Sequence, residues 1–107
     1  MFALFIALQV AIATPAPALV PVTEPSQRIA KILSTGDGRT QATAYKVKYV
    51  AEEYAVLRTF GLELEIQSLV IGKDHRAFDV LTGKDPKTGA KIDLWFDITS
   101  FFGKEFG

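Results

Sequence analysis

The stretch RAFDVLTGKDPKTGAKIDLWFDI, Arg76–Ile98, decides the fold, because two strand patterns flank one strong turn signal. At residues 85–89 the sequence reads Asp-Pro-Lys-Thr-Gly. Proline presets the first central φ, Asp85 can accept a hydrogen bond from the turn backbone, and Gly89 suits the left-handed position. The second strand alternates cleanly, and its apolar face carries Ile92, Leu94, Phe96 and Ile98. We therefore predict two antiparallel strands, 76–82 and 91–98, with those four residues facing a core.

A third strand precedes this hairpin. Residues 62–71 begin with alternating leucine and glutamate and become fully apolar at Leu69-Val70-Ile71. Gly72-Lys73-Asp74 then supplies a turn. The C-terminal half is therefore expected to form a three-stranded meander.

Upstream of the meander the hydrophobic period changes to that of a helix. From Val50 to Phe60 apolar residues recur at helical spacing, and Glu52 and Glu53 occupy the first turn, where the helix dipole favours acids. Thr43–Lys48 alternates as a short strand does. A single helix over residues 42–60 is the competing interpretation. In either case we expect these glutamates to lie on a solvated face, as with Glu63 and Glu65.

Ser26–Ser34 has the pattern of a short amphipathic helix. The Gly36-Asp37-Gly38 sequence after it predicts a tight turn, since neither a regular series of acidic calcium ligands nor a Lys-Ser/Thr pair follows. Together these elements predict a small α+β domain: a meander plus a short N-terminal strand in an antiparallel sheet, covered on one face by one or two helices.

The N-terminus has the features of an export leader. Residues 2–13 carry no charge, and Ala16-Pro17-Ala18 is a small-x-small cleavage pattern. No lysine or arginine precedes the apolar run, and an uncleaved membrane anchor is the rival; however, about 20 apolar residues are needed to cross a bilayer. We predict a leader over residues 1–18, a proline-containing linker over 19–25 and one domain over 26–107.

Composition restricts both the address and the chemistry. The chain has twelve basic and twelve acidic residues, one histidine and no cysteine. A balanced charge argues against nucleic-acid binding, and the lack of cysteine excludes disulfides and thiolate metal sites. We expect a periplasmic or secreted bacterial protein, cleaved near Ala18, with no metal and no cofactor, and in contact with a membrane only if the leader is retained.

Two aspartates could form a ligand or catalytic site. Asp79 and Asp97 lie within predicted strands, where aspartate is disfavoured. If the hairpin register sets them opposite each other beside Trp95, the pair could raise one pKa or hold a hard cation. A shift of one residue separates them. The sole histidine, His75, lies in a predicted turn, where a solvated role is the simpler interpretation.

Aromatic residues are dense near the C-terminus, at Trp95, Phe96, Phe101, Phe102 and Phe106, and a domain of this size cannot bury all of them. Core packing accounts for Phe96 and part of the tail. The remainder, Trp95, Phe101 and Phe102, would form an apolar patch of the kind that binds proteins. A tail folded back to cap its own sheet is the alternative.

The sequence also resembles a family of small, uncharacterised bacterial proteins, many with export leaders. The resemblance rests on Gly36-Asp37-Gly38, on residues 43–47 and 52–57, on Gln67-Ser68-Leu69 and Phe78-Asp79-Val80-Leu81, and on the closing block WFDITSFFG at 95–103. It implies a shared fold and an envelope address, but no activity and no site residue.

Two functions are compatible with these patterns. The first is a non-enzymatic exported interaction module that uses Trp95, Phe101 and Phe102 to bind an envelope protein. The second is a small-ligand-binding or hydrolytic domain built on Asp79 and Asp97. Poverty of catalytic groups favours the first.

Overall fold

The computed structural model describes residues 19–104, so the predicted leader and Phe106 lie outside the described residues. Along this range the helices are α2 (Gln27–Leu33) and α3 (Val50–Thr59). The strands are β1 (Tyr45–Lys46), β2 (Glu63–Ile71), β3 (Ala77–Lys84) and β4 (Lys91–Asp97), with a 3₁₀ turn, η1 (Lys73–His75), between β2 and β3. The predicted strand-then-helix arrangement over 43–60 is confirmed, and the competing interpretation of a single helix over 42–60 is wrong.

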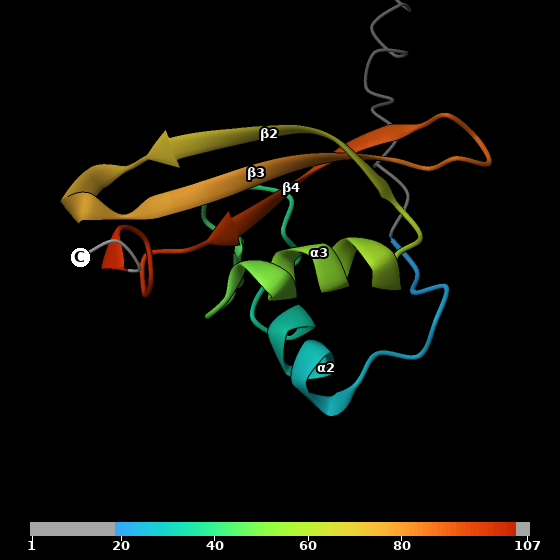
Figure 1. Ribbon diagram of the computed structural model, residues 1–107, viewed down its shortest axis with the longest axis horizontal. Coiled ribbons are helices and arrows are strands. Elements are labelled where there is room, and N and C mark those ends of the chain that lie inside the picture. The colour runs from blue at the N-terminus through green and yellow to red at the C-terminus, as the bar shows by residue number, and fades with distance from the viewer. Residues whose placement is uncertain (1–18, 105–107) are drawn as a thin grey trace, which may run out of the picture.

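The strands form one sheet in the order β1-β4-β3-β2 (Figure 1). β2, β3 and β4 are the antiparallel meander that the sequence predicts. β1 corrects the prediction of an all-antiparallel sheet, because it pairs with β4 in parallel. Parallel neighbours need a long connection, and α3 with two strands supplies it here. The domain is α+β with a mixed sheet.

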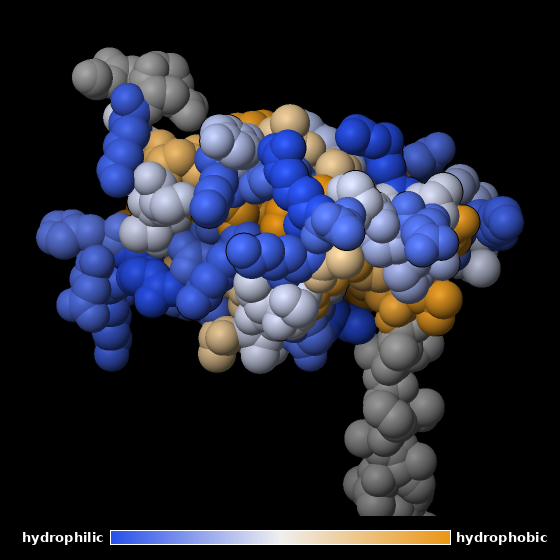
Figure 2. Space-filling model, turned by 90° about the horizontal axis from the view of Figure 1, so that it is seen from below, coloured by the Kyte–Doolittle hydropathy of each residue, from blue (hydrophilic) through white to orange (hydrophobic). Residues whose placement is uncertain are grey.

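The core lies between the sheet and the two helices, which cover the same face (Figure 1). As predicted, β4 turns Ile92, Leu94 and Phe96 toward this core, with Ile98 following the strand. From α3, Val56 and Leu57 pack against them. We call this the helix-side face of the sheet, and the other the outer face. Figure 2 views the molecule from below: polar side chains cover most of this surface, with apolar atoms showing in gaps between them.

Both helices begin where side chains satisfy free backbone N–H groups. Ser26 accepts a hydrogen bond from the Ile29 N–H at 3.2 Å at the start of α2. At α3, Glu52 accepts from the Lys48 and Tyr49 N–H groups at 2.6 and 3.3 Å and forms an ion pair with Arg28. Glu52 is therefore buried, contrary to the expectation of a solvated residue.

The hairpin turn between β3 and β4 has the predicted chemistry. The Gly89 N–H donates to the Asp85 carbonyl at 2.7 Å, and the Asp85 carboxylate accepts from the Lys87 N–H at 2.8 Å. Gly89 has a φ of 78°, in the left-handed region that favours glycine. This turn fixes the register of β3 against β4.

The segment before α2 lies against the domain. The Val22 N–H donates to the Thr59 carbonyl at 2.7 Å, and Leu19 packs against the core. The side chains of Val20 and Val22 are exposed. Residues 19–25 are thus attached at the C-terminal end of α3.

Candidate interaction surface

β2 forms an uncovered edge of the sheet. Among residues 19–104, β3 is the one strand beside it. Nearly every residue of β2 is exposed, and its large apolar side chains are exposed at Leu64 (41%), Ile66 (56%), Leu69 (52%) and Ile71 (58%). Exposed apolar residues gathered along one strand are typical of an interaction surface.

The apolar side chains of β2 project from both faces of the sheet. Leu69 stands opposite Asp79, which stands opposite the core residue Phe96 on the next strand. Leu69 therefore points to the helix-side face, as Ile71 does. Ile66 stands opposite Thr82 and points to the outer face. The helices lie beneath β3 and β4, and β2 lies farthest from them (Figure 1). Neither face of β2 is therefore buried against the helix layer.

The backbone of β2 presents hydrogen-bonding groups along this edge. The Gly72 N–H donates to the Arg76 carbonyl at 2.8 Å, so this pair closes the β2–β3 ladder. Because pairing alternates along an antiparallel ladder, residues 66, 68 and 70 also direct their N–H and C=O groups toward β3. The same groups of Gln67, Leu69 and Ile71 point away from the sheet, and no strand within 19–104 pairs with them.

Protection against edge pairing is confined to one end of β2. Natural edges are usually blunted by charge, proline or bulges. The ladder is irregular between Leu64 and Ile66, where Glu65 forms an ion pair with Lys91 at 3.0 Å. Residues 66–72, IQSLVIG, contain no charge and no proline. The opposite edge, β1, is short; it contains the exposed Lys46 and is followed by the exposed Lys48.

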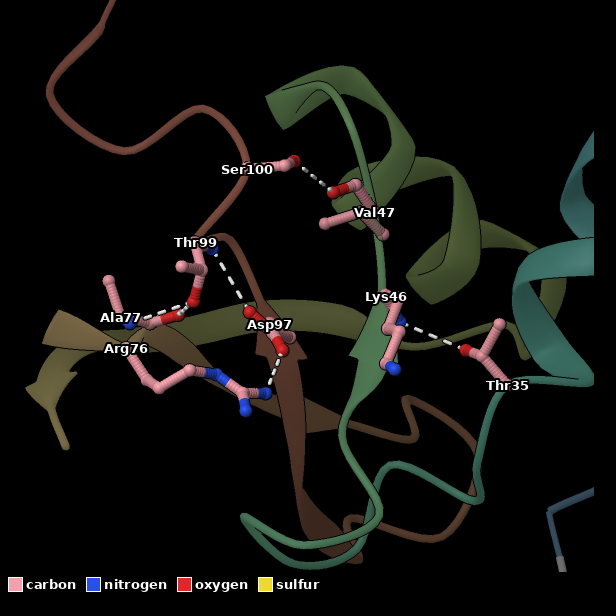
Figure 3. Close-up of polar contacts among 8 residues, drawn as sticks. All are labelled: Thr35, Lys46, Val47, Arg76, Ala77, Asp97, Thr99 and Ser100. Carbon is pink, nitrogen blue, oxygen red and sulfur yellow. Dashed lines mark hydrogen bonds and ion pairs between the residues drawn. The ribbon is translucent and has the colours of Figure 1, made fainter. Parts of the chain in front are cut away.

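The end of β4 holds a polar network (Figure 3). Asp97 pairs with Arg76 and accepts a hydrogen bond from the Thr99 N–H at 3.0 Å. Thr99 Oγ1 in turn accepts from the Ala77 N–H at 3.0 Å. Ser100 donates to the Val47 carbonyl at 3.3 Å. The Asp-Ile-Thr-Ser block therefore ties β4 to its neighbours.

Asp97 is ionised within this network. Burial acts to raise the pKa of its carboxyl group, but the hydrogen bonds from Thr99 and the guanidinium of Arg76 outweigh burial and lower it below the ordinary 3.8. A carboxylate bound in this way stabilises the fold and is not free to act as an acid or base.

The hypothesis of an Asp79/Asp97 site is wrong. Asp79 stands opposite Phe96, and Asp97 stands opposite Phe78, so the two aspartates point to opposite faces of the sheet. The register is one residue away from the one that would have joined them. A third strand aspartate, Asp93, accepts a hydrogen bond from Thr82 on the outer face at 2.6 Å.

Asp79 instead faces a glutamate of α3. Glu53 is 1% exposed, and its carboxyl oxygens have no hydrogen-bond partner within 3.5 Å in the described part of the chain. Burial, followed by the neighbouring Asp79 carboxylate, raises the pKa of Glu53 from the ordinary 4.5 to about 9. Glu53 is therefore protonated at neutral pH, and the solvated role expected for it is wrong.

The C-terminal aromatic residues do not form one patch. Trp95 lies on the outer face, half-buried, with its ring 6.1 Å from that of Phe78 in an edge-on arrangement. Phe101 packs against the core on the helix-side face, beside Tyr49 and Val50. Phe102 is exposed next to it. Trp95 and Phe101 therefore lie on opposite sides of the sheet.

The turn between β2 and β3 has an unusual backbone. Asp74 and His75 have φ values of 56° and 62°, in the left-handed region that non-glycine residues rarely adopt. His75 is exposed. The open depression beside this turn is lined by Lys73, Asp74 and Arg76 but not by His75.

Residues 22–105 match the family model described as "Domain of unknown function (DUF4919)". The chain belongs to this DUF4919 family. The match confirms the resemblance to an uncharacterised family without established activity. No curated protein and no solved structure matches the chain.

The described part of this DUF4919 chain holds no cluster of three or more metal-ligating side chains. Over the same residues, no helix is sufficiently long and apolar to cross a membrane. The sequence contained one signal for the surface that was missed. Leu69-Val70-Ile71 reads as a strand buried on both faces, but an apolar run at a sheet edge gives the same pattern.

Proposed function

We propose that this DUF4919 domain is an exported, non-enzymatic interaction module that binds a protein partner by adding a strand to β2. The observation that carries the proposal is the uncharged stretch 66–72, with exposed apolar side chains on both faces and outward-pointing backbone groups. An extended partner segment could satisfy those groups and cover those side chains together.

The polar residues that could have suggested catalysis have structural partners, which supports a binding role. Asp97 is held by Arg76 and Thr99, and Ser100 donates to a backbone carbonyl. Asp79 lies under α3 beside Glu53. The export part of the proposal is supported by the apolar run of residues 2–13 and the Ala16-Pro17-Ala18 pattern.

Site-specific photo-cross-linking in the native cell envelope tests this function. A photoreactive residue at Leu69 should give discrete cross-linked species, and one at Lys31, which is exposed on α2, should not. Equal labelling at both positions, or none at Leu69, would contradict the proposal. Cross-links from Phe102 alone would place the interface on the C-terminal tail, as the aromatic residues suggested.

Mass spectrometry of the protein's own N-terminus tests the proposed export and leader cleavage in the same sample. A mature chain that begins at Leu19 would support export with cleavage after Ala18. A chain that still begins at Met1 would contradict cleavage, and alkaline extraction would then show whether the chain stays in the membrane pellet.

A further inference from the structure

We propose that the partner of β2 is β2 of a second copy of this chain, paired antiparallel about a two-fold axis at Leu69. The inference rests on the proposed function, since it names the occupant of the exposed strand. In this dimer the sheets of the two copies would join at β2 and form one continuous sheet.

The backbone geometry fixes which residues can meet. Only residues whose N–H and C=O groups point outward can exchange hydrogen bonds across the new contact, and these are Gln67, Leu69 and Ile71. The uncharged stretch 66–72 has Leu69 at its centre. An axis at Leu69 therefore pairs the whole stretch with itself, with Leu69 opposite the second copy's Leu69 and Gln67 opposite its Ile71.

The side chains are compatible with this register. On the helix-side face Leu69 meets the second copy's Leu69, and on the outer face Ser68 meets its Val70. Because no charged residue lies in 66–72, no like charges stand opposite each other along the paired stretch. The exposed side chain of Leu69 would be covered by its own symmetry mate, and that of Ile71 would pack beside the second copy's Gln67.

Charges at the two ends of β2 favour the antiparallel direction. Glu63 and Glu65 lie at its start, and Lys73 and His75 follow its end, together with Asp74. The proposed register sets Glu65, which also contacts Lys84 and Lys91 of its own chain, opposite the second copy's Lys73. A parallel arrangement would bring the glutamates of the two copies together and is disfavoured.

A cysteine scan tests the register, because the chain has no cysteine of its own. Directly opposed residues in a hydrogen-bonded antiparallel pair have Cα atoms about 5.5 Å apart, which a disulfide can span. Under mild oxidation, the full-length Leu69→Cys protein should form a covalent dimer. The matched variant Ile71→Cys should not, since the two Ile71 residues lie four positions out of register, about 13 Å apart.

A second measurement does not depend on disulfide formation. In sedimentation equilibrium the wild-type mass should rise from one copy to two with concentration. Leu69→Lys should shift that transition at least tenfold higher in concentration, and Phe102→Lys, also at an exposed apolar site, should leave it unchanged. Far-UV circular dichroism checks that both variants fold.

The inference is overturned if Leu69→Cys dimerises no better than Ile71→Cys, or if Leu69→Lys associates like the wild type. Its failure is separable from that of the proposed function. Cross-links from Leu69 to a different protein in the envelope, with a purified chain that stays monomeric, would overturn the second copy as partner but support strand addition.

Discussion

Asp79 and Phe96 stand opposite each other across β3 and β4, and this pairing sends Asp79 to the helix-side face and Asp97 to the outer face. The two aspartates therefore meet different partners. Asp97 is ionised and held by Arg76, whereas Asp79 lies beside a glutamate that burial keeps protonated. Opposite dependences of stability on pH follow from these two environments.

Glu53→Gln should stabilise the domain, increasingly so as pH rises. The folded-state pKa of Glu53 is about 9, against an ordinary 4.5. Between these two pH values the native state therefore keeps a proton that the unfolded chain has already lost. Stability therefore falls as pH rises through this window. At neutral pH the cost to the wild type is about 3 kcal/mol, and glutamine avoids it. Urea unfolding at several pH values measures the difference.

Glu63→Gln, at an exposed carboxylate of β2, is the control for simple loss of a negative charge. It should change the free energy of unfolding by less than about 0.5 kcal/mol. If the gap between Glu53→Gln and the wild type stays constant from about pH 6 to about pH 8, the buried, protonated state of Glu53 is contradicted.

Asp97→Asn should destabilise the domain by about 2 kcal/mol at neutral pH, because it removes the charge that binds Arg76. The pKa of Asp97 lies below 3.8 in the folded state, so its contribution is present above that value and lost as pH falls through the folded pKa. The variant and the wild type should thus converge in acid. A deficit that persists unchanged at low pH would show that the carboxylate charge is not the cause.

The sequence predicted the meander because its signals are local. The 85–89 turn sets its own hydrogen bonds, and alternation along 91–98 chooses which residues enter the core. The parallel pairing of β1 with β4 could not be predicted this way, since it joins residues about half the chain apart. Strand lengths and turn signals do not specify which edge a short strand joins.

The candidate site was less accessible to prediction than the fold. Whether Asp79 and Asp97 share a face depends on a shift of one residue, which composition does not fix. Glu53 follows Glu52 in a pattern typical of a solvated first turn, yet both side chains are buried under tertiary contacts. Edge exposure of β2 is likewise a property of the sheet order, not of the strand's own residues.

Trp95→Ala and Phe102→Ala should separate packing from surface exposure. Trp95 is half-buried and contacts Phe78 edge-on, so its truncation should cost about 2 kcal/mol of stability. Phe102 is exposed, and its truncation should cost less than about 0.5 kcal/mol. Thermal unfolding followed by circular dichroism measures both. Equal, small effects would mean that Trp95 contributes little to packing and is available to bind a partner.

Gly38→Ala should be more harmful than Gly89→Ala, although both glycines have a positive φ near 70–80°. At either position alanine meets the strain of the left-handed region, about 1 kcal/mol. At Gly89 the added Cβ would meet nothing within 4 Å, so strain is the whole cost. At Gly38 it would lie 2.3 Å from the ring of buried Tyr45, which contacts Phe96 in the core.

Relieving the contact at Gly38 requires Tyr45 or the 36–43 loop to move, and the Gly38 carbonyl accepts a hydrogen bond from the Trp95 N–H at 2.7 Å. We therefore expect Gly38→Ala to cost at least about 2 kcal/mol more than Gly89→Ala in urea unfolding. Nearly equal losses would mean that the loop yields freely. In that case Gly38 would be required for its backbone conformation alone, and packing against Tyr45 would play no part.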